Sequence, residues 1–325
     1  MPTWSGILTE LKHKEEQGVG PPFDAVRRKY MAATYKKTGR NTLLYATKWT
    51  QAGAIDPELL MITDEDVQGL MEVIHGLKGP NLDLIVHSPG GSPEATEAIV
   101  SYLRTKFSDI RVIIPQLAMS AATMLACASN RIVMGKHSFI GPIDPQFILH
   151  TQVGVQAIPA QAILDQFELA KSECENPKKL GSWLPILSQY GPALLIQCEN
   201  ALELSQQLVS EWLESYMFAD TENADIISSE IAGKLADHKE FKSHGRHINR
   251  DKAKKMGLII EDLEEDQEFQ DYILSVFHAT THTFNGTNAV KIIENHNGMA
   301  FINQQQRILI HPEPTPPKSS AEPQK

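Results

Sequence analysis

The chain has few cysteines, and they are widely spaced. Cys127, Cys174 and Cys198 are the three cysteines in 325 residues, and no two of them form a CxxC pair. This odd and scattered set excludes a disulfide framework and a zinc knuckle as the basis of the fold. It favours a reducing compartment, so we expect a cytoplasmic protein.

Long apolar runs are also missing. The N-terminus leads into the charged stretch Glu10–Gln17 without the apolar segment of a signal peptide. A membrane-spanning helix needs a run of about eighteen or more apolar residues, and the sequence contains none. We therefore expect no integral membrane segment.

Positive charge is the scarcer sign. Thirty Lys and Arg residues stand against 40 Asp and Glu, which gives a formal net charge of −10, and no long basic run offsets it. A protein that binds the phosphate backbone of a nucleic acid needs clustered positive charge. The composition therefore argues against nucleic acid as a partner.

The histidines lack the pattern of a metal site. His278 and His282 are four residues apart and would share one helix face, but the Glu of an HExxH motif is absent. We predict neither a metal nor a cofactor. A second group of histidines is interpreted as a polar loop, with a contact to substrate left open: His238, His244 and His247.

Strands and helices alternate through the middle of the sequence. Leu82–Val86, Arg111–Ile114 and Arg131–Met134 have the apolar character of buried strands, and helical spacing follows in Pro93–Lys106 and Ala121–Ser129. Such alternation is typical of β-α-β units with a mostly parallel sheet. The sequence predicts an α/β fold.

The strand signal fades after Gly154, and helical patterns dominate the residues that follow. We expect four regions along the chain. They are an N-terminal helical arm (1–40), a core (41–265) with a helical insertion at about 159–240, a helical or extended segment (266–310) and a disordered, proline-rich tail (311–325).

A glycine turn follows the first of these strands. Ser88-Pro89-Gly90-Gly91 leads into a helix, and a turn without Cβ atoms lets a substrate backbone approach. Backbone amides near a helix N-terminus favour negative charge, as an oxyanion hole requires. An ordinary strand-to-helix turn would have the same sequence, so this motif alone is a weak signal.

A serine stands at the corresponding place after the next strand. Ala118-Met119-Ser120-Ala121-Ala122 begins a helix with small residues, and Ser120 could be either a nucleophile or a simple N-cap. The two motifs would meet at the carboxyl ends of adjacent parallel strands, where open α/β sheets bind ligands. Together they favour Ser120 as a nucleophile, with Gly90, Gly91 and Ala121 as oxyanion donors.

These motifs, followed by Gly141-Pro142-Ile143-Asp144-Pro145, resemble those of the ClpP-class serine peptidases. Within that class the sequence is most similar to signal peptide peptidase A and the serine dehydrogenase proteinase group. A weaker similarity extends from Gly245-Arg246 to Gly257-Leu258. The resemblance implies a ClpP/crotonase-like fold of repeated β-β-α units with helical additions, and an acyl-enzyme formed on Ser120.

The general base is less clear from the sequence. ClpP supplies a histidine one strand after the serine, but Ile143 occupies that position here, with His137 and His150 on either side. Signal peptide peptidase A uses a lysine from a downstream helix, and by spacing the matching residue is Lys171. We predict a Ser120–Lys171 dyad, while the alternatives stay open: Lys136, Lys178, Lys179 or a histidine.

The predicted substrate is an extended polypeptide that adds as a strand beside Gly90-Gly91. We expect Ser88, Ser92 and Met119 to contact it. The resemblance further implies a homo-oligomer and allows an adaptor or ATPase partner. Two other functions share this fold, namely a crotonase-like acyl-CoA enzyme and a catalytically inactive oligomeric scaffold.

Overall fold

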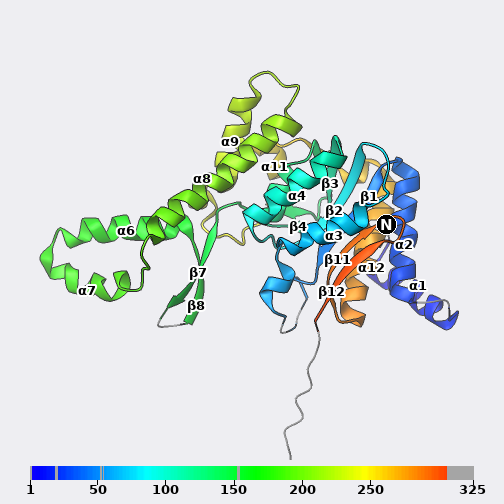
Figure 1. Cartoon of the computed structure of the whole chain (residues 1–325), viewed down its shortest axis with the longest axis horizontal. Helices are drawn as coiled ribbons and strands as arrows, with labels where there is room; N and C mark the ends of the chain where they lie inside the picture. Colours follow the sequence, from blue (N-terminus) through cyan, green and yellow to red (C-terminus); the bar gives the residue numbers. More distant parts are fainter. Residues whose placement is uncertain (1, 19–20, 52, 54, 152–153, 306–325) are drawn as a thin grey trace, which may run out of the picture.

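The computed structural model of the chain describes residues 2–18, 21–51, 53, 55–151 and 154–305. The predicted tail 311–325 lies outside these residues. The described part consists of a layered α/β body and a smaller group of helices and strands that projects from it (Figure 1).

The body is built on a mixed sheet. Within the described residues it has seven strands in the order β10-β5-β3-β2-β1-β11-β12. The strands from β10 to β1 are parallel, whereas β11 and β12 pair antiparallel. Their bounds are β1 Asn41–Thr47, β2 Asn81–His87, β3 Asp109–Ile114, β5 Arg131–Met134, β10 Ile260–Asp262, β11 Ala289–Asn295 and β12 Ala300–Gln304. The predicted α/β fold is confirmed, and the segment after residue 266 contributes two of its strands.

The strands are apolar on both sides because both faces of the sheet are covered. Leu84 and Val86 of β2 join the larger apolar cluster, and Ile85 between them joins the smaller one on the opposite face. Ile113 of β3 lies beside Ile85 in the smaller cluster. Strands buried on both faces appear in a sequence as continuous apolar runs, which is why these were predictable.

Helices form a layer on each face (Figure 1). The larger cluster packs under α3 Glu65–Ile74, α4 Pro93–Lys106, α5 Ala121–Cys127, the C-terminal half of α8 Leu194–Trp212, α9 Ala224–Ala236 and α11 Arg250–Met256. The smaller cluster packs under α2 Pro22–Thr38 and α12 Gln267–Gly286. Short turns of other helix types are η1 Pro57–Leu60, η2 Leu213–Met217 and η3 Leu263–Glu265, and α10 spans His238–Phe241.

The N-terminal helices belong to this layer. Ile7 and Leu11 of α1 Trp4–Glu16 contact Val26 of α2 and Ala279 of α12. Residues 1–40 were expected as an N-terminal helical arm. The described residues of this segment form two helices that cover one face of the sheet, because their apolar side chains pack against α12.

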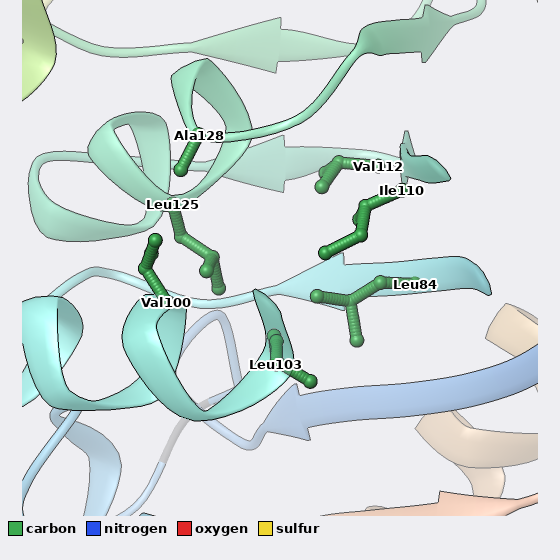
Figure 2. Close-up of a pocket in the computed structure, with 7 residues that line it drawn as sticks. All are labelled: Leu84, Val100, Leu103, Ile110, Val112, Leu125 and Ala128. Carbon is green, nitrogen blue, oxygen red and sulfur yellow. The ribbon is translucent and has the colours of Figure 1, made fainter. Parts of the chain in front are cut away.

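The space between α4, α5 and the sheet is filled with aliphatic side chains. Figure 2 shows these side chains pointing toward one another from the two helices and from strands β2 and β3. They surround a cavity of about 10 Å³, which holds at most one water molecule and has an apolar lining. The lining residues are Leu84, Val100, Leu103, Ile110, Val112, Leu125 and Ala128.

We call residues 146–187, apart from 152–153, the arm. It contains the hairpin of β7 Gln146–Thr151 and β8 Gly154–Pro159, followed by α6 Ala160–Cys174 and α7 Pro177–Leu187. Figure 1 shows the arm at the end of the molecule away from the main sheet, with α8 running back to the body. This hairpin was not predicted from the sequence, since mainly helices were expected after Gly154.

Candidate active site

Ser120 lies in a strained turn between β4 Leu117–Ala118 and α5. Its backbone has φ 52° and ψ −123°, a left-handed conformation that residues other than glycine rarely adopt. Ser120 occupies the N-cap position of α5, but its side chain makes no capping hydrogen bond. Strain of this kind persists at functional sites, and the hydroxyl of a nucleophile in such an elbow is free for chemistry.

The glycine turn lies against this elbow. Ser88 N–H donates to Leu117 O (3.1 Å), and Met119 N–H donates to Ser88 O (3.0 Å). Gly90 has φ 100°, and a Cβ there would lie 2.6 Å from Met119 O and 2.7 Å from the Ala121 nitrogen. Only glycine therefore fits at position 90.

The three predicted oxyanion donors differ in their partners. Gly90 N–H donates to Ser88 Oγ at 3.2 Å, so it is used inside the turn. For the N–H groups of Gly91 and Ala121, no hydrogen-bond partner occurs among the described residues. These two amides are the ones that could receive an oxyanion.

A pocket of about 440 Å³ opens at this point. Its lining is mostly apolar and includes residues from the glycine turn, the Ser120 elbow, the base of the arm and the loop before β9 Ile248–Asn249. The lining residues are Trp49, Met61, Pro89, Gly90, Gly91, Pro93, Met119, Ser120, Met124, Ile143, Pro145, Gln146, Ile148, Ser205, His244, Gly245 and His247. Apolar pockets with a few convergent polar groups are typical of ligand sites.

His244 lines the pocket and contacts a buried carboxylate. Its Nδ1 lies 2.9 Å from Asp144 Oδ1, and Asp144 is only 1% exposed. A carboxylate only accepts hydrogen bonds, so Nδ1 of a neutral His244 carries the proton and Nε2 keeps a lone pair. A proton acceptor oriented by a carboxylate therefore lines the same pocket as Ser120.

A small three-stranded sheet brings these distant segments together. β4 pairs with β6 Phe139–Ile140, and β6 pairs with β9. Ser120 follows β4, Asp144 follows β6 and His244 precedes β9. A second link is the Thr123 hydroxyl, which donates to Ala118 O and accepts from Gly141 N–H.

Lys171 lies elsewhere. It is on the outer surface of α6, its side chain is 58% exposed, and its amine lies 2.8 Å from Glu168 Oε1. Neither Lys171 nor the alternatives Lys136, Lys178 and Lys179 line the pocket. The hairpin of the arm carries α6 away from the sheet, so the spacing along the sequence does not bring Lys171 to Ser120 within this single chain.

The three predicted substrate contacts separate into two groups. Met119 lines the pocket. Ser88 is buried and its Oγ accepts from Gly90 N–H, whereas Ser92 caps α4 by accepting from Ala95 N–H at 3.0 Å. Both serines therefore hold the backbone of the turn in place, and neither lines the pocket.

Neither histidine of the pair on α12 lines the pocket. His282 Nε2 lies 3.0 Å from Trp4 O, and burial lowers the pKa of His278. Within the described residues, no group of three or more His, Cys, Asp or Glu side chains is arranged to hold a metal ion. None of the helices in the described part of the chain combines the length and the apolar character of a membrane span.

Sequence reasoning missed Asp144 and His244 as a pair. Asp144 was part of the motif Gly141–Pro145, next to Ile143, where the histidine of ClpP was sought. His244 directly precedes the Gly245-Arg246 segment, which carries the weaker similarity. An acidic residue in the first motif and a histidine beside the second were the available signals.

Comparison with known proteins finds relatives that match parts of the chain. Two uncharacterised proteins of Methanocaldococcus jannaschii are 37% identical over 91 residues and 34% identical over 112 residues. These matches cover 28% and 34% of the chain, and they span about a third of each relative (32% and 36%).

Two solved structures of the 1510-N membrane-bound stomatin-specific protease, both mutants and one with a substrate peptide, are 16% identical with a TM-score of 0.35. They cover 63% and 62% of this chain, and 77% and 71% of their own. The family model of ClpP-like SDH-type serine proteinases matches residues 54–184, which include Ser120 and Asp144 but not His244. Over these residues, the chain is similar to the ClpP-like SDH-type serine proteinases.

Proposed function

We propose that the chain is a serine endopeptidase in which Ser120 is the nucleophile, His244 the general base and Asp144 the residue that orients His244. One observation carries the proposal. A serine in a left-handed elbow shares a pocket with a histidine whose Nδ1 contacts a buried carboxylate. This is the set of groups that a hydroxyl needs to become a nucleophile at neutral pH.

The reaction proceeds in two steps. Ser120 Oγ attacks the peptide carbonyl carbon as its proton passes to His244 Nε2, and the developing oxyanion accepts hydrogen bonds from the N–H groups of Gly91 and Ala121. The C–N bond then breaks, and the leaving amine takes the proton from His244. Water, deprotonated by His244, then attacks the acyl carbon; the bond to Ser120 Oγ breaks, and Oγ takes the proton back from His244.

The backbone of the glycine turn supports binding of an extended chain. Ile62 N–H donates to Gly90 O (2.8 Å), and Ser92 N–H donates to Ile62 O (3.0 Å). In such a parallel bridge, the N–H and C=O of Gly91 itself point to the other side, toward the pocket. We therefore infer that a polypeptide substrate adds as a strand to Gly91 and places an apolar side chain among Met119, Met124 and Ile143.

A homo-oligomer is the second part of the proposal. Leu169, Leu184 and Ile196, on α6, α7 and the start of α8, are each more than half exposed in the single chain. Exposed apolar groups of this kind mark interaction surfaces. We expect Leu184→Asp to weaken self-association at least about tenfold by analytical ultracentrifugation, while Glu168→Gln, at an exposed polar position of α6, leaves it unchanged. An adaptor or ATPase partner and a cytoplasmic location stay predictions.

A fluorophosphonate probe tests the catalytic assignment, because it labels activated serines. We expect the wild type to be labelled, Ser120→Ala not to be labelled, and His244→Gln to react at least about 10³-fold more slowly. Lys171→Met should react within about twofold of the wild type. Fluorescently labelled casein, as an unfolded substrate, should be cleaved in the same order.

The same experiment separates the alternatives. Loss of labelling in Lys171→Met with little change in His244→Gln would establish the Ser–Lys dyad instead. A wild-type protein that remains unlabelled at every pH would favour the inactive scaffold. Labelling of Ser120 without cleavage of any polypeptide would favour the crotonase-like acyl-CoA enzyme.

A further inference from the structure

Asp144 contacts two histidines. His244 Nδ1 lies 2.9 Å from Oδ1, and His238 Nδ1 lies 3.1 Å from Oδ2. The carboxylate is 1% exposed, and these imidazoles are its side-chain partners among the described residues. His238 starts α10, whereas His244 lies in the loop before β9.

The two histidines differ in whether they line the Ser120 pocket. Both rings must donate through Nδ1, since a carboxylate only accepts, and each neutral ring then has its lone pair on Nε2. His244 lines the Ser120 pocket, but His238 is absent from the lining residues. Of these two histidines, only His244 therefore lines the same pocket as Ser120.

We propose that His238 is a positioning residue that holds the Asp144 carboxylate in the orientation His244 requires. The inference rests on the proposed function of His244. The χ2 torsion of an aspartate is broad, so a carboxylate with one donor can rotate and weaken that bond. A second donor on Oδ2 restricts the rotation, and it also prevents a buried oxygen from being left without a partner.

The backbone around His238 is held by other contacts. Ile143 N–H donates to Leu235 O at 3.0 Å, which ties the Asp144 segment to the end of α9. Asp237 caps α10 through its own side chain, accepting from Lys239 N–H and Glu240 N–H. The neighbouring charges are paired, Lys239 with Asp165 of α6 and Glu240 with Lys252 of α11. A substitution at His238 therefore removes the donor while these contacts keep the segment folded.

Two variants isolate the donor. His238→Leu removes it, and His238→Asn keeps an N–H close to the position of Nδ1. With the fluorophosphonate probe, we expect His238→Leu to lower the maximal labelling rate about 10- to 100-fold while the probe concentration for half-maximal rate stays within twofold. His238→Asn should recover a rate within about threefold of the wild type. Equal rates for both variants, whether fast or slow, would overturn the proposal.

The ring tautomers supply a readout that does not depend on peptidase activity. In ¹⁵N-histidine-labelled protein, His244 should be the Nδ1–H tautomer in the wild type and in His238→Asn, and should lose part of that population in His238→Leu. If this shift occurs in a protein that the probe does not label, the proposed function fails and the positioning role stands. If the His244 tautomer is the same in all three proteins, the positioning role fails, whatever the labelling shows.

Discussion

The main sheet and the arm use apolar residues in opposite ways. Every residue of α5 is buried, whereas none of the residues of α7, all of them described, is buried although the helix contains three leucines and a tryptophan. Strand β2 is buried almost throughout, while the side chains of β8 are largely exposed. The central strands of the body are covered within one chain, and the arm has apolar side chains that a single chain leaves exposed. The candidate site lies at the boundary, with Ser120 on the body and Ile148 at the base of the arm.

Breaking an ion pair should reduce stability far more in the body than in the arm, and we expect this difference to be the largest between the two regions. Lys291 Nζ lies 2.7 Å from Asp66 Oδ1, both side chains are at most 1% exposed, and Tyr45 also donates to Asp66. Asp66→Ala leaves a buried lysine without its partner and should lower the free energy of unfolding by about 3–5 kcal/mol in urea titrations. Lys179→Met breaks the exposed pair with Glu173 in the arm and should leave the urea midpoint unchanged. Similar losses of stability in Asp66→Ala and Lys179→Met would contradict the difference between body and arm.

Two leucines test the same contrast for packing. Leu84 lies in the core against α4 and α5, and Leu184 on α7 is 56% exposed. Leu84→Ala should lower the free energy of unfolding by about 2–5 kcal/mol, because it removes buried methyl groups and leaves a cavity. Leu184→Ala, measured in dilute protein, should change it by less than about 0.5 kcal/mol. A large loss in Leu184→Ala at low concentration would mean that the arm is packed within one chain.

The loss of folding stability at acidic pH should come from a buried histidine of the body, not from the arm. Burial lowers the pKa of His87 from 6.5 to about 4, so the unfolded chain binds this proton at a higher pH than the folded protein. The contribution of His87 to stability is complete above pH 6.5 and is lost as the pH falls from 6.5 towards 4, amounting to about 3 kcal/mol. His87→Leu should flatten this part of the stability curve. His150→Leu, on an exposed position of β7, should follow the wild-type curve in urea titrations at pH 4.5 and pH 7.

Modification of the thiols should disturb the protein least. The rate at which Cys174 is modified reports directly whether the arm is exposed. Burial raises the pKa of Cys127 to about 12, so about one molecule in ten thousand has a thiolate there at pH 8. Cys174 at the end of α6 is partly exposed. Iodoacetamide should modify Cys174 long before Cys127, as peptide mass spectrometry would detect. Protection of Cys174 at high protein concentration alone would show that another copy covers the arm.

The sequence predicted the parts of the fold that local patterns determine. The strands at residues 82–134 were recognisable because burial on both faces requires unbroken apolar runs. Strand β11 was not assigned to the core, because its pairing with β1 joins segments at opposite ends of the chain and has no local signal. The β7–β8 hairpin was missed for a related reason, since its exposed strands show little of the apolar pattern that marks a buried one.

The candidate site also combines residues that local motifs predict with residues that only the tertiary structure brings together. The sequence predicted Ser120, Gly91 and Ala121 as site residues from two short motifs on adjacent strands, and these roles stay predictions. The contact between His244 and Asp144 could not be predicted, because the two residues lie a hundred positions apart in the sequence and the pairing of β4, β6 and β9 brings them together. Lys171 was chosen by spacing along the chain, which does not determine a distance in space when a projecting hairpin intervenes.

The position of β1 in the sheet has a consequence for synthesis. This strand pairs with β2 on one side and with β11 on the other, Leu43 standing opposite Asn295. On the ribosome, β1 and β2 emerge long before residues 289–295, so the nascent chain presents an uncovered strand edge throughout most of translation. Such edges recruit other strands. The time between these two events is the period in which the growing polypeptide is most exposed to aggregation through this edge, and faster elongation would shorten it.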